Sequence, residues 1–143
     1  MNEIIVNLYE ECFYWPTYQG LLNMVFNNHD YGKIGWLILI IPIIILIIFY
    51  KFWDPVSSSK LKWWLTILSI SILGYISAST VLYNNTKIIQ YLGNYTGGNG
   101  QPDADYFIIQ MSLMTLVYSL IIAFILSIIP FRLISSNNRN NPF

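Results

Sequence analysis

The chain has 143 residues, of which 55% are hydrophobic and only 10% are charged, and its mean hydropathy is +0.52. Because soluble domains carry about 25% charged residues, this composition excludes a free soluble globule and a disordered tail. Seven lysine and arginine residues balance seven aspartate and glutamate residues, which leaves no positive excess for binding nucleic acid. The single cysteine excludes an internal disulfide bond and a cysteine-based zinc site.

Residues 1–34 are predicted to form an amphipathic segment outside the membrane. Hydrophobic positions recur at helical spacing in residues 1–13 and 18–26, with Pro16 between the two stretches. A helix that binds lipid by charge is rich in lysine and arginine, whereas the first stretch is acidic. We expect its carboxylates to dock another protein, and the alternative is a plain membrane-surface helix that covers the chain's own spans. The three docking candidates are Glu3, Glu10 and Glu11.

Three hydrophobic stretches are long enough to cross a membrane, and they are predicted to form transmembrane helices at 35–53, 63–83 and 106–129. A helix needs roughly 20 residues to cross the hydrocarbon core, and it satisfies every backbone N–H and C=O within the segment. The predicted fold is therefore all-α: an integral membrane protein with three transmembrane helices and an amphipathic N-terminal helical segment.

The connections between these spans differ in length and composition. Residues 54–62 form a short loop, residues 84–105 form a longer loop rich in glycine and asparagine, and residues 130–143 form a polar tail. Within the longer loop, residues 87–92 fit either a helical continuation or a short strand. Asp103 is expected to cap the third span, because its carboxylate suits the positive end of a helix.

Lysine and arginine residues predict the orientation of the spans, because cytoplasmic loops carry more of them. Two of the seven, Lys33 and Lys87, lie on one side of the predicted membrane. The other five lie on the side of the short loop and the tail: Lys51, Lys60, Lys62, Arg132 and Arg139. The N-terminus is therefore predicted to lie outside and the C-terminus inside.

Tryptophan residues near the ends of the spans are expected to anchor them at the two membrane interfaces. An indole ring combines an apolar body with a polar N–H, and it therefore favours the level of the lipid headgroups. The predicted anchors are Trp36, Trp53, Trp63 and Trp64.

Small side chains predict where the helices pack, because they let two backbones approach closely. One stripe on the second span consists of Ser71, Gly74 and Ala78. A stripe on the third span consists of Ser112, Thr115, Ser119 and Ala123. The first span has no such stripe and is expected to face mostly lipid. A neighbouring stripe of hydroxyl residues consists of Thr66, Ser69, Ser77 and Thr80. It gives the second span more packing surface than its two neighbours can occupy. We therefore expect contacts with other membrane protein subunits or with copies of the same chain.

Residues with reactive side chains form no catalytic or metal-binding pattern in the sequence. His29 and Asp30 are adjacent and do not easily point into one site, and Asp103 and Asp105 fit a helix cap and a solvated loop. Cys12 lies on the apolar side of the first stretch, as a buried structural thiol would. The predicted spans have no ionisable residue in their central parts, which argues against a coupled transporter or a proton channel. We therefore expect no enzymatic activity, cofactor, metal or small-molecule substrate.

These observations favour a non-catalytic structural or anchoring subunit of a larger assembly in an envelope, organelle or viral membrane. The alternatives are a holin-like pore-forming membrane protein, which would share three spans and this orientation, and a small oligomeric channel. The expected partners are the lipid bilayer and other membrane proteins, and no motif is specific enough to indicate a family.

Overall fold

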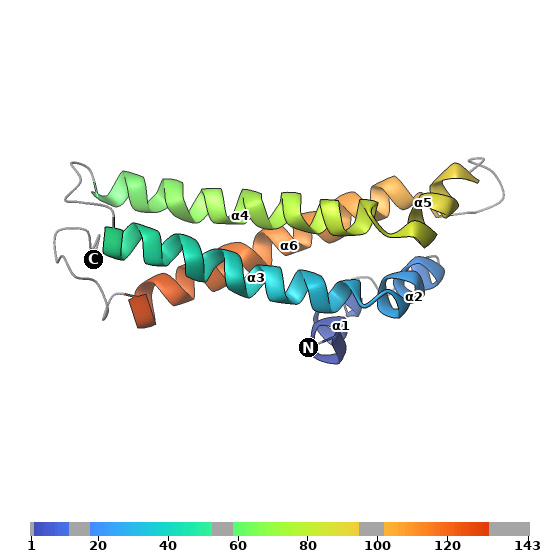
Figure 1. Cartoon of the computed structure of the whole chain (residues 1–143), viewed down its shortest axis with the longest axis horizontal. Coiled ribbons are helices and arrows are strands. Elements are labelled where there is room, and N and C mark those ends of the chain that lie inside the picture. The colour runs from blue at the N-terminus through green and yellow to red at the C-terminus, as the bar shows by residue number, and fades with distance from the viewer. Residues whose placement is uncertain (1, 12–17, 53–58, 95–101, 132–143) are drawn as a thin grey trace.

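A computed structural model describes residues 2–11, 18–52, 59–94 and 102–131 of the chain (Figure 1). All regular elements in these residues are helical, which confirms the prediction of an all-α chain. The α-helices are α1 (Asn2–Glu10), α2 (Gln19–Asn27), α3 (Asp30–Ile47), α4 (Ser59–Tyr83), α5 (Thr86–Gly93) and α6 (Ala104–Leu126). Two π-helical turns, η2 (Ile48–Phe52) and η3 (Ser127–Phe131), continue α3 and α6.

Three helical segments are long and apolar enough to cross a membrane: Asp30–Lys51, Lys60–Tyr83 and Ala104–Ile129. They lie side by side, and α4 and α6 make the most extensive contact while α3 packs against both (Figure 1). We name the two ends of this bundle for nearby elements. The α5 end holds the start of α3 together with α2 and α5, and the Lys60 end holds the start of α4.

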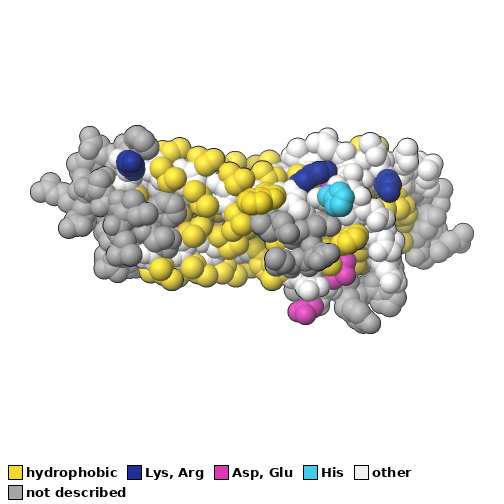
Figure 2. Space-filling model, turned by 60° about the horizontal axis from the view of Figure 1, so that its bottom comes forward, with side chains coloured by type: hydrophobic (Ala, Val, Ile, Leu, Met, Phe, Trp, Pro, Cys, Tyr) yellow, Lys and Arg dark blue, Asp and Glu magenta, His cyan; other side chains and the backbone are white. Residues whose placement is uncertain are grey.

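The outer faces of the three long helices are covered by large hydrophobic side chains. Figure 2 shows these side chains over the middle of the bundle, with charged side chains toward its ends. The exposed residues include Ile40 and Ile44 on α3, Leu68 and Ile72 on α4, and Leu113, Val117 and Ile121 on α6. An apolar surface of this extent is unusual on a soluble monomer, and it is compatible with a multi-pass membrane protein.

The first span does not differ from the others in burial as the sequence suggests. Its most apolar window is 33% buried, which lies between the values of 39% for the second span and 28% for the third. One face of α3 is buried along its length, at Ile34, Ile38, Pro42 and Leu46. These four residues are spaced four apart, and none of them is small. This face of α3 therefore packs against its neighbours through aliphatic side chains.

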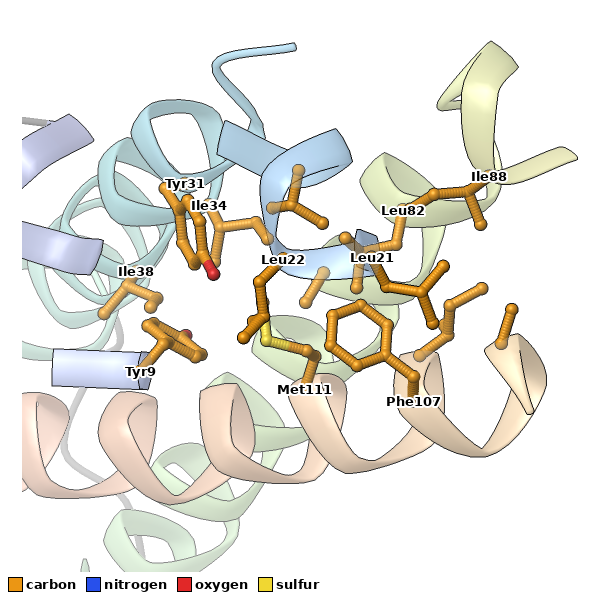
Figure 3. Packing of buried hydrophobic residues seen from close by; sticks show 14 residues of the cluster. Tyr9, Leu21, Leu22, Tyr31, Ile34, Ile38, Leu82, Ile88, Phe107 and Met111 are labelled. Atoms are coloured by element: carbon orange, nitrogen blue, oxygen red, sulfur yellow. The ribbon is translucent and has the colours of Figure 1, made fainter. Parts of the chain in front are cut away.

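The buried hydrophobic residues form two clusters, one toward each end of the bundle. The cluster at the α5 end joins all six α-helices, and Figure 3 shows Leu21 and Leu22 of α2 pointing toward Phe107 and Met111 of α6. The cluster at the Lys60 end contains Leu46, Phe49, Tyr50, Trp63, Ile67, Ile70 and Ala123. The short helices α2 and α5 therefore close one end of the bundle.

Side-chain caps explain where two of the helices begin. The Asp103 carboxylate accepts hydrogen bonds from the backbone N–H groups of Asp105 at 2.9 Å and Tyr106 at 3.2 Å, which confirms its predicted role as a cap of α6. The Asn85 side chain accepts from the backbone N–H groups of Lys87 and Ile88. Residues 87–92 are consequently helical, as part of α5, and do not form a strand.

Candidate functional site

The small-residue stripes of α4 and α6 pack against each other within the chain. A Cβ atom built on Gly74 would lie 2.9 Å from Cβ of Ser119, a distance that real Cβ atoms essentially never show. The other six predicted packing residues are all buried: Ser71, Ala78, Ser112, Thr115, Ser119 and Ala123. Much of the surface that the sequence assigns to helix packing is therefore used inside the chain.

The neighbouring hydroxyl stripe of α4 is only partly covered. Thr66 is buried, whereas Ser69 and Thr80 are exposed. Ser69 and Thr80 each donate a hydrogen bond of 2.8 Å to the carbonyl four residues earlier in the helix. Because these hydroxyls are satisfied within α4, the exposed part of the stripe presents mainly hydrocarbon and needs no polar partner.

Hydroxyl groups also link the helices in the interior. The Thr115 hydroxyl donates to the Met111 carbonyl at 2.9 Å, so its oxygen is left to accept from the Tyr9 hydroxyl at 2.7 Å. The Ser79 hydroxyl donates to that of Ser112 at 2.8 Å. Within the described residues, the buried Ser119 hydroxyl has no hydrogen-bond partner. These groups are spread along the helices and do not form a nucleophile–base pair.

Helix α1 is held against the bundle by aromatic residues. The ring of Tyr9 packs edge-on against that of Tyr118, with centroids 5.3 Å apart, and lies 6.0 Å from that of Tyr31. The Tyr118 hydroxyl donates to the Leu8 carbonyl at 2.8 Å. Burial raises the pKa of the Tyr9 hydroxyl well above its ordinary value.

The three glutamates predicted to dock a partner all belong to or adjoin α1. Glu10 is half-buried and Glu11 is exposed, whereas Glu3 lies in α1 but its side chain is outside the described residues. Figure 2 shows acidic side chains beside the apolar surface, toward the α5 end.

A buried carboxylate at the α5 end is the polar feature that the sequence did not reveal. Asp30 is fully buried, and its oxygens accept from the amide of Asn28 at 2.9 and 3.1 Å and from the amide of Asn85 at 2.6 Å. Lys33 forms an ion pair with it at 2.7 Å. His29, the residue before it, adopts a left-handed conformation with φ of 57°, which turns the chain from α2 into α3.

Asp30, Asn28, Lys33 and Asn85 form a cluster, the Asp30 cluster, that joins segments distant in sequence. Its contacts serve to hold these segments together. Asn85 uses its amide N–H on Asp30 and its oxygen on the first backbone N–H groups of α5. All of these polar atoms are thereby paired with each other. The sequence offered one weak signal, an acidic residue in the first turn of a long apolar helix, where the helix dipole favours a carboxylate.

The predicted tryptophan anchors occupy two kinds of environment. Trp36 is 55% exposed and Trp64 is 49% exposed, as an interface anchor would be. Trp63 is only 1% exposed, and its indole N–H donates to the Ser127 hydroxyl at 2.5 Å. The Tyr50 hydroxyl lies 2.7 Å from the same Ser127 oxygen. Trp63 therefore joins the three spans at the Lys60 end, and Trp53 lies outside the described residues.

Among residues 2–11, 18–52, 59–94 and 102–131, no three His, Cys, Asp or Glu side chains gather as metal ligands would. The sequence matches no family model, and it finds no match among the curated proteins or the solved structures with which it was compared.

Proposed function

We propose that the chain is a non-catalytic membrane subunit that anchors or holds together partners in a larger membrane assembly. The observation that carries this proposal is the combination of an apolar outer surface with an interior closed by direct helix contact. The outer surface suits insertion into lipid, and the interior contacts give the chain a rigid body to which partners can attach.

The close packing of α4 and α6 favours an anchor over a pore formed by one chain. A water-filled path needs space and polar walls, whereas Gly74 lies directly against Ser119. On either side of this contact lie the two hydrophobic clusters. A channel would therefore have to form between several copies of the chain, along surfaces that are now apolar.

The distribution of charge supports an orientation with the N-terminus outside. Lys51, Lys60 and Lys62 lie toward the Lys60 end. Among the described residues, this end has no acidic side chain. The acidic residues Glu10, Glu11, Asp30, Asp103 and Asp105 belong to segments toward the α5 end. An excess of lysine marks the cytoplasmic side, so the α5 end and α1 would face outward.

We propose that partners dock on the acidic face of α1. This face stays accessible while the small-residue stripes of α4 and α6 are occupied, so it is the better candidate for a polar contact. A basic or hydrogen-bond-donating surface on an extracytoplasmic partner domain would complement Glu10 and Glu11.

Purification from native membranes in mild detergent tests this function. We expect the chain to migrate as a complex well above its own 16.6 kDa with partners in constant ratio, and the double change of Glu10→Gln and Glu11→Gln to weaken that association. Lys87→Gln is the control, since it alters an exposed charge at the same end without touching α1. A uniform monomer would contradict the proposal. Abrupt loss of membrane potential on bacterial expression would support the holin-like alternative instead.

A further inference from the structure

A groove lies between α3 and α4 toward the Lys60 end, with a volume of about 340 Å³. One wall consists of Ile45, Ile48 and Phe49, at the junction of α3 with η2. The facing wall belongs to α4, and the groove includes Lys62 near the start of α4. The groove thus runs along the apolar part of the helices and ends beside a cation.

The α4 wall is apolar although two of its residues carry hydroxyl groups. Thr66 donates its hydroxyl to the Lys62 carbonyl, and Ser69 donates to the Leu65 carbonyl, each at 2.8 Å. Both hydroxyls are therefore used within α4. Ser69 is also small, whereas the exposed residues beside it, Leu65 and Leu68, are large. The groove is consequently a notch that a hydrocarbon chain can fill without leaving a polar atom unpaired.

The charge at the end of the groove selects the kind of headgroup. Among the described residues Lys62 forms no ion pair, and Lys51 and Lys60 add positive charge at the same end. The N-terminus of α4 contributes further positive potential there. Basic pockets between transmembrane helices on the cytoplasmic side are suited to anionic lipid headgroups.

We propose that this groove binds one acyl chain of an anionic phospholipid, with the phosphate held beside Lys62. The apolar walls accept the chain and the lysine accepts the phosphate, so both parts of one molecule are matched. A zwitterionic headgroup would bring its own cation toward Lys62 and would be disfavoured. A hydrophobic helix from a partner would fill the notch less well, because it would leave the lysine facing an apolar surface.

The test uses the full chain in mild detergent, to which phosphatidylglycerol and phosphatidylcholine with identical acyl chains are added, and native mass spectrometry counts the retained lipids. We expect phosphatidylglycerol to be retained in preference. Lys62→Gln should lower this preference about fivefold, as the loss of one interfacial lysine implies. Lys60→Gln removes the same charge two residues away, outside the groove, and should change the preference little.

A second pair of variants tests the groove itself and does not depend on the charge. Ser69→Phe fills the notch and should lower retention of both lipids. Thr80→Phe is the control, since it adds a similar ring at another exposed α4 residue whose hydroxyl also bonds within the helix. Thermal unfolding of each variant confirms that it is folded.

Several outcomes would overturn the proposal. Equal retention of the two lipids would do so, as would equal effects of Lys60→Gln and Lys62→Gln, which would indicate a diffuse surface charge. Displacement of the lipid by inorganic phosphate would identify a simple anion site. Unchanged lipid retention in Ser69→Phe with a smaller complex would identify a protein helix in the groove. The measurement is made on the isolated chain, so its result is independent of whether partners dock on α1.

Discussion

The carboxylate of Asp30 and the amide of Asn85 meet at 2.6 Å in the interior of the α5 end, although the two residues are 55 positions apart in the chain. Both side chains are fully buried. Asn85 at the same time caps α5, so one contact fixes the start of α3 against the turn between α4 and α5. Because a buried donor or acceptor without a partner is unfavourable, this pair favours a single arrangement of the helix ends.

Asp30→Ala should therefore destabilise the α5 end. The change removes the shorter hydrogen bond of the buried Asn85 amide, whose other acceptor is the Met24 carbonyl at 3.4 Å. We therefore expect the free energy of unfolding to fall by about 1–3 kcal/mol. Reversible unfolding in mixed detergent micelles measures this. Lys33→Ala is the comparison: the lysine side chain is 53% exposed, and an exposed ion pair contributes about 0–1 kcal/mol. Equal losses in the two variants would show that the ion pair, and not the amide contact, matters.

The contact between Gly74 and Ser119 gives a second prediction. Gly74→Ala introduces a methyl group where α6 already lies, and overpacking of this kind costs about 1–3 kcal/mol. Gly20→Ala is the matched control, because a Cβ atom at this position in α2 meets nothing within 4 Å and alanine favours the helix. The second change of Ser119→Gly should restore part of the stability of Gly74→Ala. No recovery in the double variant would argue against this contact.

Much of the bundle could be predicted from the sequence, because long apolar stretches allow few alternatives to a helix. The small residues of α4 and α6 were also assigned to packing faces. Their partner was not evident, since a stripe of serine, glycine and alanine looks the same whether its partner lies in the same chain or in another. The structure identifies the partner by showing which residues of the two helices lie opposite each other, as Gly74 lies against Ser119.

The parts that escaped prediction depend on contacts between distant segments. Nothing in the sequence adjacent to Asp30 indicates that Asn85 will contact it. The sequence around this buried carboxylate therefore looks like that of a solvated turn. Trp63 and Trp64 are neighbours and point about 100° apart on a helix, so they can lie in different environments. The sequence pattern does not say which one is buried, because that choice depends on where Ser127 of η3 lies.

The different environments of Trp63 and Trp64 lead to a third prediction. Trp63→Ala removes a buried ring and the hydrogen bond that its indole N–H donates to the Ser127 hydroxyl, so we expect a loss of about 3–5 kcal/mol in unfolding free energy. Trp64→Ala removes a ring that is half exposed and should cost much less in micelles. Its effect should instead be on position in the bilayer, measured by the depth at which brominated lipids quench the remaining tryptophans. A larger loss of stability in Trp64→Ala would contradict the arrangement at the Lys60 end.

The buried hydroxyl of Tyr9 makes the attachment of α1 sensitive to alkaline pH. Burial raises its pKa in the folded chain, so the folded state favours the neutral form relative to a tyrosine in water, whose pKa is about 10. The contribution to stability is therefore constant below about pH 10 and is lost as the pH rises above that value. Hydrogen exchange of the α1 backbone should accelerate at pH 10.5 relative to pH 8 by more than the intrinsic chemistry requires.

Tyr9→Phe isolates this effect from other tyrosines. The variant loses the hydrogen bond to Thr115, which should weaken α1 docking by about 0.5–1.5 kcal/mol at neutral pH. It also lacks the ionisable group, so its additional exchange above pH 10 should largely disappear. Tyr106→Phe changes an exposed ring at the start of α6 and should retain the alkaline response. If Tyr9→Phe kept the full response, a different group would have to govern the release of α1, and the docked position of Tyr9 between Tyr118 and Tyr31 would not account for it.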